Sequence, residues 1–262
     1  MRLLMVGDIV GRPGRTAAHR LIPALRREHG VDFVVANAEN AAGGIGITRE
    51  IAVELLEQGG VDVVTLGNHA WAKREVYGYL DGEPRVLRPV NYPPGAPGHG
   101  HGLFQTPAGP VGVAVVQGRV FMEAIDDPFR AADAVLADLR RAAPIVLVDL
   151  HAEATSEKQA IGWYVDGRAT AVLGTHTHVQ TADERVLPNG TAYITDVGMT
   201  GPIDSVIGMS RETVLARFTT SVPTRFEVAD GPARLCAVLV EADAGTGRAL
   251  RIERIQVMSE GK

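Results

Sequence analysis

The chain has 262 residues, of which 26 are Lys or Arg and 31 are Asp or Glu, so its formal net charge is −5. Apolar residues make up 45% and charged residues 22%, a composition that excludes extended disorder, collagen-like repeats and coiled coil. Single α/β domains often reach about 250 residues, so we expect one domain over residues 1–262. The mild acidity argues against binding of duplex nucleic acid, which usually favours a basic face.

The single cysteine, Cys236, excludes an internal disulfide framework and a cysteine-rich zinc module. A metal site would therefore draw its ligands from His, Asp, Glu and Asn. The apolar run at residues 3–6 is too short for the core of a signal peptide. Because no stretch approaches the roughly 18 apolar residues of a membrane span, we expect a cytoplasmic protein without a membrane partner.

The N-terminal part of the chain alternates short apolar runs with helical patterns. Runs typical of strands buried on both faces occupy residues 3–6, 33–36 and 61–66. We expect a helix over residues 15–29, with a kink or an early break at Pro23. A second helix is expected from an N-cap at Thr48 through residue 56. This alternation predicts an α/β fold that begins with a parallel sheet.

The middle of the chain contains a loop rich in proline and glycine at residues 88–102. A hairpin is expected next, from residues 103–106 and 111–116. An amphipathic helix at residues 128–141 and three strands follow, at residues 145–150, 171–173 and 192–195. Residues 212–256 alternate more and predict antiparallel strands, which include residues 235–240 and 250–256.

Five of the expected strands end in a potential metal ligand. The side chains are Asp8, Glu39 with Asn40, Asn68 with His69, His151, and His176 with His178. Each of these alone is more typical of a turn, a helix cap or an exposed strand end. Their recurrence favours a shared site, because ligands in open α/β sheets bind beyond the carboxyl ends of the strands.

Oxygen and imidazole ligands suit divalent ions such as manganese, iron or zinc. Alternate residues of a strand share one face, so His176 and His178 could converge on one ion. A carboxylate can bridge two cations, and two ions about 3.5–4 Å apart can clamp a phosphoryl group and generate a hydroxide nucleophile. The residues alone therefore indicate metal-assisted hydrolysis. A zinc amidohydrolase is disfavoured, because the H-x-H pair of such enzymes normally follows the first strand, whereas here the pair comes after residue 175.

The motifs resemble those of the calcineurin-like metallophosphoesterases, and more closely those of their YmdB-like phosphodiesterase branch. Two residues depart from the broad superfamily pattern, and both departures look like the YmdB-like branch: Val10 stands where a histidine is usual, and Glu39 replaces the usual bridging aspartate. The matching blocks reach from Asp8 to about Ser210. They are Gly7-Asp8, Asn37-Ala38-Glu39-Asn40, Gly67-Asn68-His69, the block from His151 to Lys158, and the block from Gly174 to Asp183.

The resemblance implies an α/β sandwich of two mixed sheets flanked by helices, in four layers, with two divalent metal ions at the strand ends. Iron or manganese is expected, with zinc or magnesium as alternatives. Glu39 would bridge the two ions. One ion would be surrounded by Asp8, Glu39, Asn40 and His178, and the other by Glu39, Asn68, His151 and His176.

The implied reaction is hydrolysis of a cyclic nucleotide such as cAMP, or of a related small phosphodiester. A bridging hydroxide would attack phosphorus in line with the leaving group, and His69 would protonate the leaving oxygen or stabilise charge on the phosphoryl group. Two alternatives stay open: a phosphomonoesterase on the same site, and a nucleotide-binding regulatory protein with little turnover. Self-association is also implied by the resemblance.

Further residues near the motifs are weaker candidates for substrate binding. Arg12 and Arg15 could reach phosphate oxygens, or they could belong to a solvated helix start. Glu153 and Thr155 stand in an expected polar loop after His151. A last pair, His99 and His101, could form a mobile lid or simply be exposed.

Overall fold

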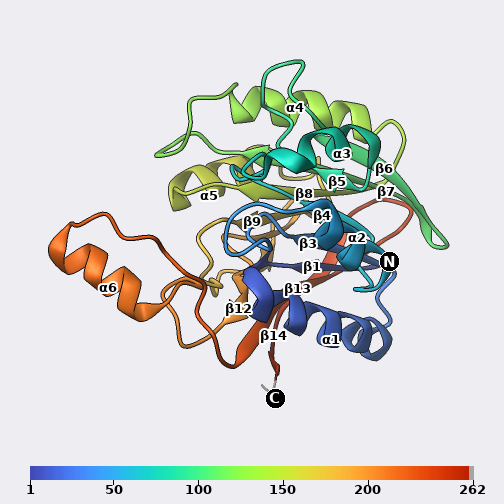
Figure 1. Ribbon diagram of the computed structural model, residues 1–262. Coiled ribbons are helices and arrows are strands. Elements are labelled where there is room, and N and C mark those ends of the chain that lie inside the picture. Colours follow the sequence, from blue (N-terminus) through green and yellow to red (C-terminus); the bar gives the residue numbers. More distant parts are fainter. Residues whose placement is uncertain (260–262) are drawn as a thin grey trace.

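Two mixed β-sheets lie face to face in the computed structural model, which describes residues 1–259 (Figure 1). The eight-stranded sheet has the order β2-β12-β13-β1-β3-β4-β5, with β14 paired to β13. Its strands are β1 (Arg2–Val6), β2 (Asp8–Ile9), β3 (Phe33–Asn37), β4 (Val63–Thr65), β5 (Val86–Leu87), β12 (Met199–Pro202), β13 (Ala233–Ala242) and β14 (Ala249–Ser259).

The six-stranded sheet has the order β10-β11-β9-β8-β7-β6. Its centre is parallel, since β7, β8, β9 and β11 run in one direction, and β6 and β10 add antiparallel edges. These strands are β6 (His101–Thr106), β7 (Gly109–Gln117), β8 (Ile145–His151), β9 (Ala171–Thr175), β10 (Arg185–Val186) and β11 (Ala192–Ile194).

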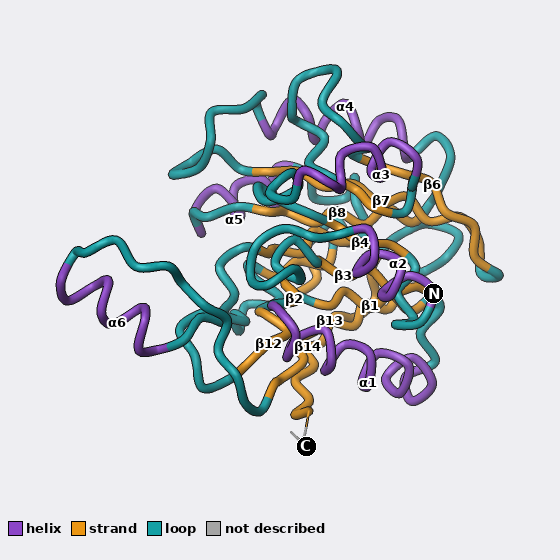
Figure 2. The backbone as a smooth tube through the Cα atoms, in the orientation of Figure 1, coloured by secondary structure: helices purple, strands orange, loops and turns teal. Residues whose placement is uncertain are grey.

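Helices cover the outer face of each sheet, so that the molecule has four layers (Figures 1 and 2). Against the eight-stranded sheet pack α1 (Gly11–His29) and α2 (Arg49–Glu57), and against the six-stranded sheet pack α4 (Pro128–Leu139) and α5 (Thr155–Tyr164). A short 3₁₀ turn, η1 (Arg74–Val76), leads into α3 (Tyr77–Gly82). The expected α/β sandwich is confirmed.

The core between the sheets explains why so many strands read as continuous apolar runs. Leu3 and Met5 of β1 lie in the same buried cluster as Val113 of β7 and Leu147 of β8. The alternate residues of these strands face the helices instead, as Leu4 does. A strand buried on both faces has no polar side to show, so its sequence lacks alternation.

The first helix is longer than expected, because α1 begins at Gly11 rather than at residue 15. Pro13 lies in its first turn, where no backbone N–H is needed for an intrahelical bond. The expectation of an early break at Pro23 is wrong, since α1 continues to His29 and ends at Gly30, whose φ is 58°. The second helix is as expected, with the Thr48 side chain accepting from the Ile51 N–H.

Besides α3, two further stretches form helices that the sequence pattern did not indicate. Residues 155–158, expected as a loop, form the start of α5, with Glu157 and Lys158 buried. In the segment expected to be antiparallel, Arg211–Thr220 forms α6, which begins after an N-cap at Ser210. Only Val214 of α6 is buried, so this helix has no apolar stripe by which periodicity could reveal it.

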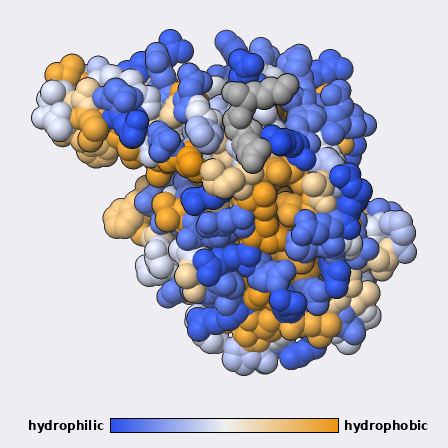
Figure 3. Space-filling view, turned by 90° about the horizontal axis from the view of Figure 1, so that it is seen from below, coloured by the Kyte–Doolittle hydropathy of each residue, from blue (hydrophilic) through white to orange (hydrophobic). Residues whose placement is uncertain are grey.

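Helix α6 projects from the sandwich on an arm (Figure 1). Its exposed side chains include Leu215 and Phe218, and Figure 3 shows apolar surface on this projection. Among residues 1–259, no helix combines the length and the apolar character that crossing a bilayer requires. The C-terminal hairpin of β13 and β14 is antiparallel, as the sequence predicted.

Candidate metal centre

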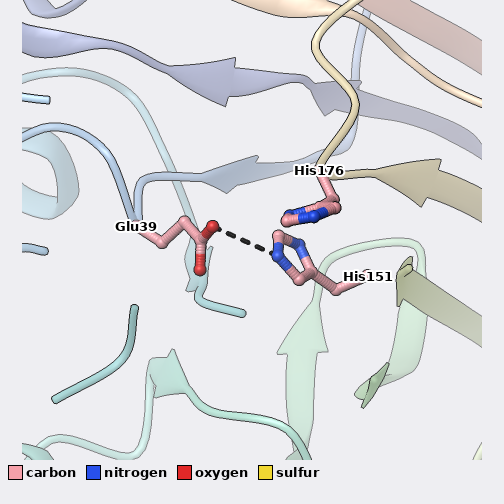
Figure 4. Close-up of side chains that lie close together, drawn as sticks. All are labelled: Glu39, His151 and His176. Atoms are coloured by element: carbon pink, nitrogen blue, oxygen red, sulfur yellow. Dashed lines mark ion pairs between the residues drawn. The ribbon is translucent and has the colours of Figure 1, made fainter. Parts of the chain in front are cut away.

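Three side chains from different strand ends converge between the two sheets (Figure 4). Glu39 follows β3, His151 ends β8, and His176 follows β9. One ligand atom from each residue lies within 4.8 Å of the others. Glu39 and His151 are completely buried. Carboxylate and imidazole groups at this spacing can hold a divalent metal ion.

The Nε2 atom of His151 faces two oxygen atoms at once. It lies 2.9 Å from Oδ1 of Asn68 and 3.1 Å from Oε1 of Glu39. The Glu39 Oε1 atom has no hydrogen-bond partner among residues 1–259, although it is buried. A buried carboxylate oxygen without a partner is costly unless a cation satisfies it. These three atoms therefore fit a metal ion better than they fit one another.

A chain of hydrogen bonds behind His151 orients its ring. The Nδ1 atom lies 2.9 Å from Oγ1 of Thr175, and that hydroxyl donates to Asp149 at 2.6 Å. Because the Thr175 proton is committed to Asp149, the hydroxyl accepts the Nδ1–H of His151. A neutral His151 then keeps a lone pair on Nε2, the nitrogen available to a metal. Asp149 and Thr175 were not among the residues predicted for the site.

The other oxygen of Glu39 is held by the loop after β4. Oε2 accepts the N–H of Gly67 at 2.8 Å and the N–H of His69 at 3.0 Å. This loop passes so close to His151 that a Cβ atom on Gly67 would lie 2.1 Å from the imidazole ring. Glycine at position 67 is therefore required for Glu39, Asn68 and His151 to meet.

Asp8, Asn40 and His178 form the neighbouring part of the site. The Nε2 atom of His178 lies 3.9 Å from Oδ1 of Asp8 and 3.0 Å from Nδ2 of Asn40. The Asn40 Oδ1 atom instead contacts Nδ1 of His69 at 2.9 Å. Ligation of an ion beside His178 through the Asn40 oxygen thus needs the amide to turn over. The Nδ1–H of His178 donates to the Ile207 carbonyl at 2.9 Å, which leaves Nε2 facing Asp8.

His176 and His178 do not lie on one strand face, which corrects the expectation from their spacing. Strand β9 ends at Thr175, and the two histidines belong to a tight turn in which φ is 92° at His176 and 66° at His178. Side chains other than glycine rarely adopt positive φ, and such strain persists only where the surroundings enforce it. The turn directs both imidazoles to the site cavity, which they line.

A buried ion pair between Lys158 and Asp196 holds the turn that contains His176 and His178. The Nζ atom of Lys158 donates to Oδ2 of Asp196 at 2.9 Å and to the Thr175 carbonyl at 2.7 Å. The same Asp196 oxygen accepts the N–H of Thr177 at 3.1 Å. Lys158 and Asp196 are almost completely buried, at 1% and 0% exposure. This network fixes the backbone on either side of His176.

Charges at the site shift several pKa values in opposite directions. Burial raises the pKa of Asp8 to about 6, even with His178 beside it. Burial alone would raise the pKa of Glu39, but His151 and His69 outweigh it and lower the value to about 2. For His151, burial is outweighed by Glu39, and the pKa rises to about 9. Burial and the charge of His151 lower the pKa of His176 to about 3. A divalent ion bound by Glu39 would supply positive charge in place of the protonated His151 ring.

A cavity of about 360 Å³ opens beside this cluster. Its polar side is formed by Glu39, Asn40, His69, His176 and His178. The His69 side chain is 31% exposed, so its ring is accessible from the cavity. A larger hollow of about 670 Å³ near α4 contains none of the residues predicted for catalysis or metal binding.

Of the four weaker candidates for substrate binding, Glu153 contacts a residue of the site directly. Glu153 lies close, with Oε2 3.0 Å from Nε2 of His176. Thr155 is exposed in the first turn of α5. Arg15 donates to the Ala41 carbonyl at 2.8 Å and lies 3.9 Å from Glu54, so its guanidinium is engaged elsewhere. Arg12 is exposed and is not among the residues that line the cavity.

The pair considered for a lid does not cover the site. His99 contacts the Asp81 carbonyl at 3.2 Å, and His101 lies 3.4 Å from Asp138. Both line hollows other than the one beside Glu39. Several apolar residues that do line the site cavity carry no recognisable motif in the sequence, among them Ile207, Met209 and Phe226.

Comparison with known proteins gives consistent matches over nearly the whole chain. The model of the family described as "YmdB-like protein" matches residues 4–255. A Bacillus subtilis protein named 2′,3′-cyclic-nucleotide 2′-phosphodiesterase is 49% identical over 257 residues, which cover 98% of this chain and 97% of that protein.

Two solved structures are similar in fold and in sequence. A protein from Thermus thermophilus superposes with a TM-score of 0.92 at 47% identity, covering 98% of this chain and 99% of that one. A structure described as a novel phosphatase from Mycoplasma pneumoniae gives a TM-score of 0.91 at 32% identity, covering 99% of this chain and 94% of that one.

Proposed function

This chain belongs to the YmdB-like family, and on that premise we propose that it is a metal-dependent phosphodiesterase acting on cyclic nucleotides or a related small phosphodiester. The observation that carries the proposal is the meeting of Glu39 Oε1, Asn68 Oδ1 and His151 Nε2 around one point. The name of the Bacillus subtilis relative makes 2′,3′-cyclic nucleotides the first substrates to test.

The site would hold two divalent ions, iron or manganese, with zinc or magnesium as alternatives. Glu39 belongs to both proposed ligand groups: its Oε1 atom faces His151 of one group, and its chain neighbour Asn40 contacts His178 of the other. One group is Asp8, Glu39, Asn40 and His178, and the other is Glu39, Asn68, His151 and His176. Bound there, the ions would offset phosphoryl charge and make a water molecule acidic enough to act as the nucleophile.

Two further residues act beside the metal ligands: His69 would donate a proton to the substrate, and Glu153 would orient His176. His69 lines the cavity, and its Nδ1 atom contacts Oδ1 of Asn40 at 2.9 Å. When the Asn40 amide turns its oxygen toward the ion, its N–H group would face Nδ1 of His69. The proton of the neutral imidazole then lies on Nε2, from where it would pass to the leaving oxygen of the ester. Glu153 contacts Nε2 of His176 and orients this ring rather than binding the substrate directly.

The test is an activity screen on protein whose metal content has been measured. The substrates are 2′,3′-cAMP, 3′,5′-cAMP and bis-p-nitrophenyl phosphate, compared with p-nitrophenyl phosphate, each assayed with manganese, iron, zinc and magnesium. We expect turnover of the diesters with manganese or iron. A clear preference for the monoester would support the alternative of a phosphomonoesterase, since the similar Mycoplasma pneumoniae protein is described as a phosphatase. Absence of turnover with all four metals would overturn both.

A further inference from the structure

The cavity beside Glu39 also has an apolar wall. Ile45 forms one part of this wall, and Ile207, Met209 and Phe226 form the rest. Three of these side chains are substantially exposed to solvent: Ile45 at 46%, Ile207 at 52% and Phe226 at 45%. Exposed apolar side chains gathered next to a cluster of polar ligands are typical of a surface that a small molecule covers.

The wall is held in place by its backbone. Met209 pairs with Val228 in a short antiparallel bridge, and the Ser210 N–H donates to the Glu227 carbonyl at 2.8 Å. This pairing returns the chain from the arm of α6 and places Phe226 at the cavity. Ile207 has a φ of 46°, rare for a β-branched residue, and its carbonyl accepts from His178. The apolar wall is thus tied directly to a predicted metal ligand.

The loop of residues 43–46, which carries Ile45, fits closely against Met209. Gly44 has a φ of 92°, and a Cβ atom there would lie 2.8 Å from Cε of Met209. The N–H groups of Gly43 and Gly44 are already used, since they donate to the carbonyls of Ala41 and Asn40. The loop therefore offers apolar contact, and its amide donors are not available to a ligand.

We propose that this wall is a nucleobase subsite, in which Phe226 stacks on the base while the phosphodiester lies at the polar side. The inference rests on the proposed function and names its substrate class as nucleoside phosphodiesters. Stacking on an aromatic ring is tolerant of base identity, because every base has a π-face. The described residues on this wall carry no polar side chain to read the edge of a base, so the subsite requires a base without selecting one.

The test compares substrates that differ only in having a base. Glycerol 1,2-cyclic phosphate keeps a five-membered cyclic diester without a base, and the 2′,3′-cyclic phosphates of adenosine, guanosine, cytidine and uridine supply the four bases. We expect the unaltered protein to show a kcat/KM at least about tenfold higher for the nucleotides, the scale of one stacked base. We expect the four nucleotides to lie within about tenfold of one another.

The variant Phe226→Ala isolates the stacking contact. We expect KM for 2′,3′-cAMP to rise about tenfold with kcat nearly unchanged, while kcat/KM for glycerol 1,2-cyclic phosphate stays the same. Phe226→Trp keeps an aromatic face and should keep the low KM. The matched control is Phe218→Ala, since Phe218 is 78% exposed on α6 and is not among the residues lining the cavity. This control should leave both substrates unaffected.

Each contrary result has its own meaning. An unchanged KM for 2′,3′-cAMP in Phe226→Ala, or equal loss of both substrates, would overturn the base subsite. Equal turnover of the base-free diester and the nucleotides by the unaltered protein would also overturn it, and would leave the phosphodiesterase activity standing. If the unaltered protein hydrolyses neither kind of diester with any of the four metals, the proposed function itself is wrong.

Discussion

The Nε2 atom of His151 lies 3.1 Å from the Oε1 atom of Glu39, although the two residues follow strands of different sheets. Glu39 comes after β3 of the eight-stranded sheet, and His151 ends β8 of the six-stranded sheet. The apolar cluster between the sheets therefore sets the distance between two predicted ligands. Changes at either strand end should affect metal binding and stability together.

Replacement of Glu39 by glutamine should remove both metal ions. The amide keeps the size of the side chain but loses the negative charge that would offset two cations. We expect the metal content, measured by inductively coupled plasma mass spectrometry, to fall from two ions per chain to below one, with loss of turnover. Glu54→Gln is the control, because Glu54 contacts Arg15 and His19 instead. Two ions still bound to Glu39→Gln would contradict the bridging role.

His69→Ala should separate metal binding from turnover. His69 contacts Asn40 and lines the cavity, but it is not assigned as a ligand. We expect unchanged metal content and a kcat reduced by about 10²–10⁴-fold, the usual contribution of a positioned proton donor. His99→Ala, outside the site, should leave kcat unchanged. If the metal content of His69→Ala fell in parallel with activity, the assignment of a proton donor would be wrong.

The candidate ligands at the strand ends could be predicted because each follows an apolar run, and the ends of neighbouring parallel strands meet at one edge of a sheet. The strand ends thus indicated Glu39, His151 and His176, which the structure brings together. They did not indicate Asp149, whose partner Thr175 is distant in sequence. Lys158 belongs to a block that was expected to form a polar loop, but no local pattern links it to its distant partner Asp196.

The apolar wall was also beyond sequence reasoning. Phe226 reaches the cavity through the arm of α6, which has no apolar periodicity, and Ile207 depends on an unusual backbone conformation. Both features arise from tertiary structure that a local pattern does not encode. The expectations of a single domain over residues 1–262, a cytoplasmic location and self-association stay predictions, as do the roles of the site residues.

Gly67→Ala should disturb the site by displacing His151 or the loop that carries Asn68. A Cβ atom at this position would lie 2.1 Å from the imidazole ring, so the ring or the loop must move. We expect metal affinity, measured by titration calorimetry, to fall by about 10–100-fold, as for other changes that misplace a ligand. Gly78→Ala is the matched control, since a Cβ atom there meets nothing within 4 Å. Equal metal affinity in both variants would contradict the assignment of His151 and Asn68 as ligands.

Removal of metal should lower the thermal stability. Buried Asp8 and Glu39 would lose the cations that offset their charges, and ions that bind only the folded state add about 2.7 kcal/mol at 100 times their Kd. For a chain of this size, that corresponds to a fall in Tm of about 5–10 °C. The fall in Tm can be measured by differential scanning calorimetry before and after chelation, with the metal content determined in both samples. A stripped protein with an unchanged Tm would argue against a metal centre.

Lys158→Met should weaken both the fold and the turn that carries two predicted ligands. The substitution leaves Asp196 as a buried carboxylate without its cation, which costs about 3–5 kcal/mol of unfolding free energy. Because Asp196 also accepts from Thr177, the positive-φ turn around it should loosen. We expect a lower denaturation midpoint in urea and a metal affinity reduced by about 10-fold or more.

A double variant separates the effect of leaving Asp196 as an unpaired buried charge from the effect of losing the packing and hydrogen bonds of Lys158. Lys158→Met combined with Asp196→Asn removes both charges and should recover part of the stability, since no unpaired charge then stays buried. Metal affinity should recover less, because Lys158 also donates to the Thr175 carbonyl, which ends β9 just before His176. If the single variant bound metal as tightly as the unaltered protein, the buried pair would serve stability only and would not position the turn.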